Sequence, residues 1–268
     1  MAQPSLLVED LQVRLGETTI MEHMSLSIAD GEFVAIIGTS GCGKTTLLRT
    51  IAGLLPRTSG RILLHDKPIV GPEARVAMVF QHFGLFPWKT VEKNVTYGLD
   101  VQGRTDPDGR VNRLLEMMHL AEARKKYPFQ LSGGMKQRAG IARALCMDPD
   151  LLLLDEPLSA VDAITREILQ AEVLQMWERQ SHMNAILVTH DLDEAILMAD
   201  RVVVLGGPPA QILLEVQVPI ERPRDPRTIR SHPQYAPLRS QLWETLQRTN
   251  AASTPTETPA ATATEKES

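Results

Sequence analysis

A glycine-rich loop at Gly38–Thr45 constrains the fold of this chain more than any other feature. It follows the apolar run Phe33–Ile37, which has the character of a buried central strand, and it opens the helix-forming stretch Lys44–Ala52. The spacing of Gly, four residues and Gly-Lys-Thr directs backbone N–H groups and a helix N-terminus toward phosphate oxygens. A chance glycine-rich turn would lack this strand and helix. We therefore predict a nucleotide site that uses Gly38, Thr39, Ser40, Gly41, Cys42, Gly43, Lys44, Thr45 and Thr46.

One basic and one hydroxyl side chain of this loop, together with an acidic pair elsewhere, have the chemistry of phosphoryl transfer. Lys44 is expected to bind the terminal phosphates, and the hydroxyl of Thr45 to ligate Mg²⁺. A second apolar run, Leu151–Leu154, ends in Asp155 and Glu156, and a strand here delivers both to the edge where phosphate-binding loops gather. Asp155 is suited to hold Mg²⁺ through water, and Glu156 to polarise the attacking water. A buried strand followed by a solvated acid pair is the alternative, and the phosphate loop argues against it.

Strand-like runs alternate with helical patterns along most of the chain, which predicts a largely parallel sheet with helices on its faces. The predicted strands are Leu6–Val13, Ile20–Ile28, Phe33–Ile37, Arg61–Leu64, Val76–Phe80, Leu151–Asp155, Ala185–Thr189, Arg201–Leu205 and Gln211–Val218. The predicted helices are Lys44–Ala52, Val91–Leu99, Asp108–His119, Gly133–Met147, Ala163–Gln180 and Pro237–Gln247. One face of the helix predicted at 163–180 is apolar and consists of Ile164, Ile168, Ala171 and Leu174.

The order of these elements predicts an α/β fold, a P-loop NTPase of the RecA-like kind. We expect a mostly parallel sheet core, an antiparallel β subdomain and an inserted α-helical subdomain. The ATPase domain is expected at residues 1–222, with the helical subdomain inserted at about 82–150, where strand signals are absent. A helical extension is expected at 223–249. Residues 250–268 are too polar to fold and are expected to form a disordered tail.

The composition is that of an ordinary globular protein, with 43% hydrophobic and 23% charged residues in 268. The formal net charge of -5 gives no basic field for nucleic acid, and no apolar run is long enough to span a bilayer. The N-terminus lacks the basic start of a secretory signal. Cys42 and Cys146 make no disulfide framework, which favours a reducing cytoplasm. Cys42 is either a small filler of the loop or a thiol whose modification blocks nucleotide binding.

A second glycine-rich loop, Leu131–Arg138, precedes the acidic strand and resembles the LSGGQ signature of the ATP-binding cassette (ABC) ATPases. The resemblance implies that Ser132, Gly133 and Gly134 meet the γ-phosphate of a nucleotide held by another subunit. Ser132 is also expected to cap the helix that follows. Met135 stands where the family usually has Gln, a change that we do not expect to abolish activity.

Other positions match the family one by one. Gln81 resembles the glutamine that touches Mg²⁺ and the attacking water, and His190 resembles the switch histidine that contacts the γ-phosphate. Asp162 ends the segment Ser159–Asp162, which resembles the loop that crosses the dimer interface. Leu15 stands near the place of the aromatic residue on which adenine stacks in the family. Because leucine lacks an aromatic face, we hypothesise weak discrimination between ATP and GTP.

The segments Gln81–Val91, Glu156–Asp162, Arg222–Pro226 and His232–Tyr235 resemble the nucleotide-binding subunits of bacterial importers for nitrate, sulfonate, taurine or bicarbonate. The resemblance implies ATP and Mg²⁺ as cofactors, a second ATP-binding subunit that is a copy or a paralogue, and an indirect link to a periplasmic or extracellular solute-binding protein. It implies a peripheral location on the cytoplasmic face of the inner membrane. A membrane permease is expected to contact Gln81–Trp88, although packing within the helical subdomain explains the apolar residues there equally well.

Other functions are less consistent with the sequence. A soluble, non-transport ABC ATPase usually carries two cassettes or a long coiled-coil insertion, and a GTPase carries guanine-reading residues such as Asn-Lys-x-Asp; none of these occurs in the chain. A P-loop kinase would not explain Leu131–Arg138. The residues that an inactive scaffold would not need are all present: Lys44, Asp155, Glu156 and His190. A basic cluster, expected to be a solvated linker or a site for acidic lipid headgroups or an anion, comprises Arg222, Arg224, Arg227 and Arg230.

Overall fold

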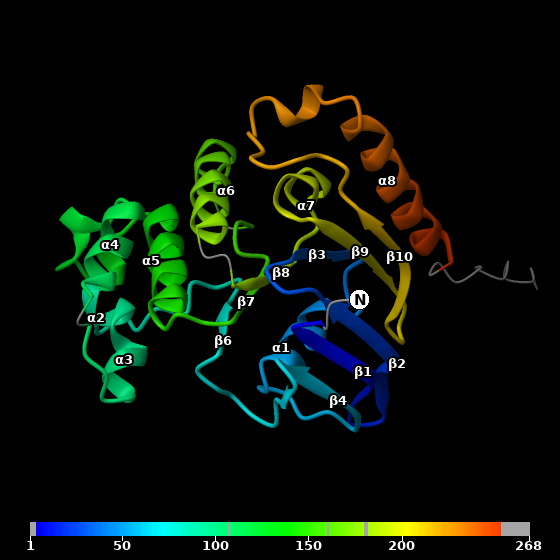
Figure 1. Ribbon diagram of the computed structural model, residues 1–268, viewed down its shortest axis with the longest axis horizontal. Helices are drawn as coiled ribbons and strands as arrows, with labels where there is room; N and C mark the ends of the chain where they lie inside the picture. Colours follow the sequence, from blue (N-terminus) through cyan, green and yellow to red (C-terminus); the bar gives the residue numbers. More distant parts are fainter. Residues whose placement is uncertain (1–3, 107, 160, 180–181, 253–268) are drawn as a thin grey trace, which may run out of the picture.

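The computed structural model describes residues 4–106, 108–159, 161–179 and 182–252, in which two sheets are surrounded by helices (Figure 1). The larger sheet has six strands in the order β10-β9-β3-β8-β7-β6, and the smaller has four in the order β2-β1-β4-β5. The strands are β1 (Leu6–Leu15), β2 (Thr18–Ile28), β3 (Phe33–Gly38), β4 (Ser59–Leu64), β5 (Lys67–Pro68), β6 (Val76–Val79), β7 (Leu151–Asp155), β8 (Asn184–Val188), β9 (Arg201–Gly206) and β10 (Gln211–Gln217). The α-helices are α1 (Lys44–Ile51), α2 (Val91–Val95), α3 (Tyr97–Val101), α4 (Arg110–Met117), α5 (Gly133–Cys146), α6 (Ala163–Glu178), α7 (Leu192–Met198) and α8 (Tyr235–Ala252).

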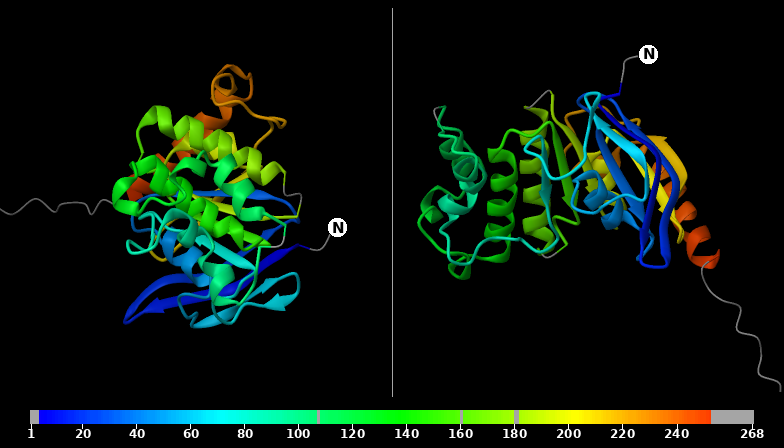
Figure 2. Two further views of the ribbon diagram at one scale, coloured as in Figure 1. Left: turned by 90° about the vertical axis from the view of Figure 1, so that its left-hand side faces the viewer. Right: turned by 90° about the horizontal axis from the view of Figure 1, so that it is seen from below.

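The six-stranded sheet is parallel except for β10, which pairs antiparallel with β9. Its central strands are continuous apolar runs because both of its faces are covered (Figures 1 and 2). Phe33, Ala35 and Ile37 of β3 face a core shared with α6, α7 and α8. Val34 and Ile36 face the opposite core, which α1 and the smaller, antiparallel sheet complete. This arrangement confirms the predicted α/β class with an antiparallel β subdomain.

Between β6 and β7 the chain leaves the sheet and forms α2, α3, α4 and α5, which lie together to one side of it (Figures 1 and 2). Apolar side chains from these helices join the core on that side, among them Val95, Leu99, Leu114 and Leu145. The helix predicted over Val91–Leu99 is instead two short helices that meet at Thr96. The four helices all lie between β6 and β7, from Val91 to Cys146.

The apolar face predicted for α6 is confirmed at Leu174, which is buried, and is wrong at Ile164 and Ile168. Ile164 is 76% exposed and Ile168 is 47% exposed. The helix instead buries a neighbouring face that includes Leu169, Val173, Met176 and Trp177. Trp177 accounts for this rotation, because its ring packs edge-on against Phe33 at 5.3 Å and its Nε1 donates to the carbonyl of Met183 at 2.7 Å. A large ring with one polar atom has fewer ways to be buried than an aliphatic side chain.

The segment after β10 packs against α7. Arg224 is buried and donates to the carbonyls of Ile220 at 2.9 Å and Ile196 at 3.1 Å. Arg222 donates to the carboxylate of Asp200 at 2.7 Å. The expectation of a solvated linker, or of a lipid-binding cluster, is therefore wrong for these two arginines, whose charges are satisfied inside the fold.

The last helix is longer than the sequence indicates. The sequence predicts a helix over Pro237–Gln247. The observed helix, α8, is longer at both ends and runs from Tyr235 to Ala252. Residues 250–252, which their composition assigns to the tail, are therefore helical. The rest of that predicted tail, 253–268, lies outside the described residues. Buried Tyr235 and Leu242 attach the helix to the body of the protein.

Glu194 of α7 is a buried carboxylic acid. Burial raises its pKa to about 7, against the opposing effect of hydrogen bonding with Thr189. A carboxyl whose pKa is raised in the folded state destabilises that state once the pH passes the unfolded-state pKa. This loss of stability is absent in acid. It grows as the pH rises from the unfolded-state pKa of the carboxyl to its folded-state pKa, and it is complete above the folded-state pKa.

We therefore predict that the free energy of unfolding of Glu194→Gln is about 3 kcal/mol higher than that of the wild type at about pH 8. At about pH 4 the two proteins should have the same free energy of unfolding. Urea unfolding at the two pH values measures the difference. Glu167→Gln, which changes an exposed carboxylate of α6, is the matched control and should leave the pH dependence unaltered. Parallel pH profiles for the wild type and Glu194→Gln would contradict the burial of a titrating acid.

Candidate active site

The phosphate loop lies between the end of β3 and the start of α1, and three of its glycines are required by geometry. A Cβ on Gly38 would lie 2.5 Å from the carbonyl oxygen of Leu205 and 2.8 Å from the Sγ of Cys42. Gly41 and Gly43 have φ values of +79° and +99°, in the left-handed region that favours glycine. The loop can therefore turn its backbone N–H groups outward at the N-terminus of α1, as a phosphate site requires.

The lysine of the loop is held by the loop itself. The Nζ of Lys44 donates to the carbonyls of Gly38 at 2.8 Å and Thr39 at 2.9 Å, and the side chain is largely buried. Its charge is thus fixed directly beside the loop. Cys42 is 1% exposed and lies beneath the loop, which supports its interpretation as a small filler rather than an accessible thiol.

Thr45 and Asp155 meet across two elements, since the Thr45 hydroxyl donates to the Asp155 carboxylate at 2.9 Å. Burial raises the pKa of Asp155, while the hydrogen bond from Thr45 and the charges of Arg49 and Lys44 act in the opposite direction. A divalent cation favours the ionised form of such a carboxylate. The described residues contain no cluster of three or more His, Cys, Asp or Glu side chains that holds a metal by itself. The hydroxyl and carboxylate oxygens of Thr45 and Asp155 are ligands of the kind that suit Mg²⁺, which also binds phosphate oxygens and water.

The carboxylate of Glu156 is contacted from two other elements. The Nε2 of Gln81 donates to its Oε2 at 3.3 Å, and the Nδ1 of His190 lies 3.4 Å from the same oxygen. Glu156 itself has a φ of +45°, uncommon for a residue other than glycine, and its backbone N–H donates to the carbonyl of Val188 at 2.9 Å. The strained backbone and the shared contacts fix the carboxylate at the end of β7. The structure thus brings together the three side chains predicted to be catalytic.

A hollow of about 540 Å³ lies at the carboxyl edge of the parallel sheet, and Asp155 and Gln81 contact its lining residues without being among them. Its lining residues are Ile20, Gly38, Ser40, Gly41, Gly43, Lys44, Thr45, Thr46, Glu156 and His190. Leu15 is not among them and its side chain is 45% exposed at the end of β1. Ile20 was not predicted, because an apolar residue in an alternating strand carries no signal of a site. A hollow of this size suits a nucleotide.

The second glycine-rich loop lies apart from this hollow. Ser132 caps α5, since its Oγ accepts from the N–H of Met135 at 3.3 Å, which confirms the predicted cap. Asp162 caps α6 in the same way, accepting from the N–H of Thr165 at 3.0 Å, and this bond lowers the pKa of Asp162. The two helix starts are neighbours, because a Cβ on Gly134 would lie 2.8 Å from the Cγ2 of Thr165. None of the described residues that line the hollow comes from either helix start.

The chain resembles known proteins over most of its length. Residues 21–159 match the family model described as ABC transporter. The chain is 47% identical over 233 residues to an aliphatic sulfonates import ATP-binding protein of Burkholderia cenocepacia, covering 87% of this chain and 84% of that protein. It is 42% identical over 238 residues to a nitrate import ATP-binding protein of Synechococcus elongatus, covering 87% and 86%. It is 40% identical over 227 residues to a taurine import ATP-binding protein of Roseobacter denitrificans, covering 83% and 84%.

A solved structure has the same fold. It is described as a dimeric post-hydrolysis state of the ATP-binding cassette MJ0796 bound to ADP and Pi. The TM-score is 0.70 at 28% sequence identity, and the match covers 81% of this chain and 100% of that one.

Two glycines allow the phosphate loop to be tested against a matched control. Gly41 and Gly16 both have positive φ, and among the described atoms nothing lies within 4 Å of a Cβ added at either position. Ala at each should therefore cost about 1 kcal/mol of stability through backbone strain alone. We predict that Gly41→Ala also weakens nucleotide binding about tenfold, by obstructing the backbone N–H groups, while Gly16→Ala does not. Titration with a fluorescent nucleotide checks this, and equal affinities for the two variants would refute it.

Proposed function

The chain belongs to the ABC transporter family of ATPases, and on that premise we propose that it powers a bacterial importer for a small anion or organic solute. The proposed solute is of the nitrate, sulfonate, taurine or bicarbonate type, as the names of the relatives at 40–47% identity suggest. The observation that carries the proposal is the division of the site: Lys44 and Glu156 line the hollow, while Ser132 lies outside it. A soluble, non-transport ATPase has no comparable support among these relatives.

ATP with Mg²⁺ supplies the phosphoryl group whose transfer to water releases free energy. Glu156 polarises the attacking water, and Gln81 and His190 hold its carboxylate in place through their contacts with one oxygen. Lys44 places its charge beside the terminal phosphates, where negative charge develops. Thr45 and Asp155 would hold the metal. These roles follow from the chemistry of each group and from its place, either in the lining of one hollow or in contact with a lining residue.

Two subunits are needed to complete each site in this proposal. Ser132, Gly133 and Gly134 lie at one helix start and Asp162 at the next, away from the hollow of the same chain. A second subunit, a copy or a paralogue, brings these groups to the nucleotide, where the N-terminus of α5 faces the γ-phosphate. The solved structure with the same fold is described as dimeric, which supports this assembly.

A rigid, exposed loop is the proposed contact with a membrane permease. The buried amide of Asn94 accepts from the N–H of Phe86 at 2.7 Å and donates to the carbonyls of Phe86, Lys89 and Thr90, so the loop backbone is fixed. Phe86 packs on Tyr97 at 4.4 Å. The neighbouring Trp88 remains 70% exposed. Internal packing explains Phe86 but not Trp88, and an exposed tryptophan on a fixed backbone is suited to anchor a partner.

Within the described ranges, every helix is too short or too polar to traverse a bilayer. The proposed location is peripheral, on the cytoplasmic face of the inner membrane, where the permease is reached through Gln81–Trp88. The solute-binding protein is then an indirect partner. Leu15, at the end of β1, remains proposed to discriminate weakly between ATP and GTP, because it offers adenine no aromatic face.

We predict that Trp88→Glu reduces solute uptake at least about tenfold in cells that contain the permease, because the loss of one interface anchor costs about 2 kcal/mol or more. ATP binding by the purified subunit should be unchanged. The matched control is Trp243→Glu, which alters a tryptophan of α8 that is 51% exposed, and uptake should be retained. Uptake that survives Trp88→Glu, or falls equally in both variants, would count against this contact.

A further inference from the structure

The helix that follows the switch histidine is short and begins with acidic side chains. α7 has seven residues and begins directly after His190 and Asp191. A helix of this length is not stable alone. Asp191 caps it, and Asp193 and Glu194 lie in its first turn. Acidic side chains at a helix N-terminus interact favourably with the helix dipole, but they also repel one another. The first turn of α7 therefore needs basic partners from elsewhere in the fold.

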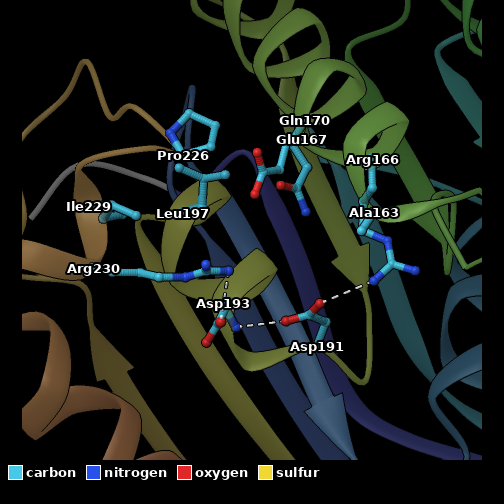
Figure 3. Close-up of a pocket in the computed structure, with 10 residues that line it drawn as sticks. All are labelled: Ala163, Arg166, Glu167, Gln170, Asp191, Asp193, Leu197, Pro226, Ile229 and Arg230. Carbon is cyan, nitrogen blue, oxygen red and sulfur yellow. Dashed lines mark hydrogen bonds and ion pairs between the residues drawn. The ribbon is translucent and has the colours of Figure 1, made fainter.

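Those partners are arginines from three other segments. The Nη1 of Arg166, in α6, lies 3.6 Å from Asp191. Asp193 contacts two arginines of the segment after β10, residues 218–252, which we call the C-terminal segment. The Nη2 of Arg230 lies 3.2 Å and the Nε of Arg239 lies 2.8 Å from its carboxylate oxygens. Figure 3 shows Arg166 and Arg230 reaching the first turn of α7 from opposite sides. Arg230 and Arg239 lie beyond the last strand, in residues that contribute nothing to the lining of the nucleotide hollow.

Packing is loose on the other side of this turn. A polar cavity of about 90 Å³ separates α6 from α7 and the C-terminal segment (Figure 3). Its lining includes Arg166, Asp191, Asp193 and Arg230. Most of α7 is closely packed, because Leu192, Ala195, Ile196 and Met198 are buried in the core, and the cavity lies beside Asp191 and Asp193. The charged contacts of Asp191 and Asp193 therefore add to this core packing by holding the first turn of α7 on the side where the cavity lies.

Asp193 is also held in its charged form. Burial alone would raise its pKa, but the Tyr235 hydroxyl and the guanidinium groups of Arg239 and Arg230 outweigh burial and lower the pKa. The same carboxylate contributes, with burial, to raising the pKa of Tyr235 to about 12. The ionised side chain of Asp193 thus joins α7 to the short turn that contains Arg230 and to the start of α8.

We propose that Asp193 is a positioning residue for His190: Arg230 and Arg239 of the C-terminal segment hold its carboxylate, fix the first turn of α7, and thereby set the His190 ring against Glu156. The C-terminal segment is then part of the hydrolytic machinery, although it does not touch the nucleotide. The inference rests on the proposed role of His190 in hydrolysis. It assigns a function to Arg230 that the sequence pattern of basic residues does not suggest.

The test compares steady-state ATP hydrolysis by full-length variants at concentrations that support dimerisation. Asp193→Asn and Arg239→Gln should each lower kcat about tenfold, because misplacing a catalytic group by about 1 Å costs at least that much. The KM for ATP should change less than about twofold, and Arg239→Lys should restore much of the loss. Glu244→Gln, at an exposed ion pair of α8, is the matched control with unchanged kcat. An unchanged kcat in Asp193→Asn would overturn the proposal.

A double-mutant cycle separates this proposal from the function on which it rests. In a His190→Ala background, Asp193→Asn should cause no further loss in single-turnover hydrolysis, because it acts through the missing ring. The same fold-loss in both backgrounds would overturn the positioning role and leave the role of His190 standing. If His190→Ala alone left hydrolysis intact, the proposed function of His190 would fail instead.

A spectroscopic measurement does not depend on activity. The ring resonances of His190 in the nucleotide-free protein should shift in Asp193→Asn and stay in place in Glu244→Gln. A change confined to thermal stability, with His190 resonances unmoved, would show that Asp193 is merely structural and would overturn the proposal.

Discussion

The parallel pairing of β3 with β8, and of β8 with β7, is the interaction on which the site depends. Parallel strands end at one edge of a sheet, so the phosphate loop after β3, the acids at the end of β7 and His190 after β8 meet there. The two buried faces of the sheet fix the register in which β3 pairs with its neighbours. A slip of one residue would move Val34 and Ile36 to the other face of the sheet and so into the other core. The backbone therefore places the catalytic groups, and side-chain contacts such as that of Thr45 with Asp155 refine them.

Features that depend on local pattern could be predicted from the sequence. The loop at Gly38–Thr45 carries its own geometry in its glycines, and the continuous apolar runs at β3 and β7 identify strands covered on both faces. The strand ends then place Asp155 and Glu156 by topology alone. The positions of Gln81 and His190 came from a resemblance, and the structure adds that both contact one oxygen of Glu156.

Features that depend on contacts between distant segments could not be predicted. Helical periodicity marks Ile164 and Ile168 as core residues, yet Trp177 rotates α6 and leaves them exposed. A cluster of arginines in a Pro-rich segment looks solvated until the fold supplies its partners, such as Asp200 for Arg222. Asp193 has no motif at all, and its role emerges only when α7, α8 and the turn before α8 are placed together. Nonlocal charge pairing leaves no trace in spacing or composition.

The central claim is that each site needs two chains, and the molar mass of Glu156→Gln with and without ATP, measured by light scattering, tests it most directly. Without hydrolysis to let the two chains separate, ATP should double the mass. Adding Ser132→Arg should abolish the doubling while ATP binding by the single chain persists, because Ser132 lies outside the hollow of its own chain. A mass that ATP does not change in Glu156→Gln, or a doubling that survives Ser132→Arg, would contradict the account.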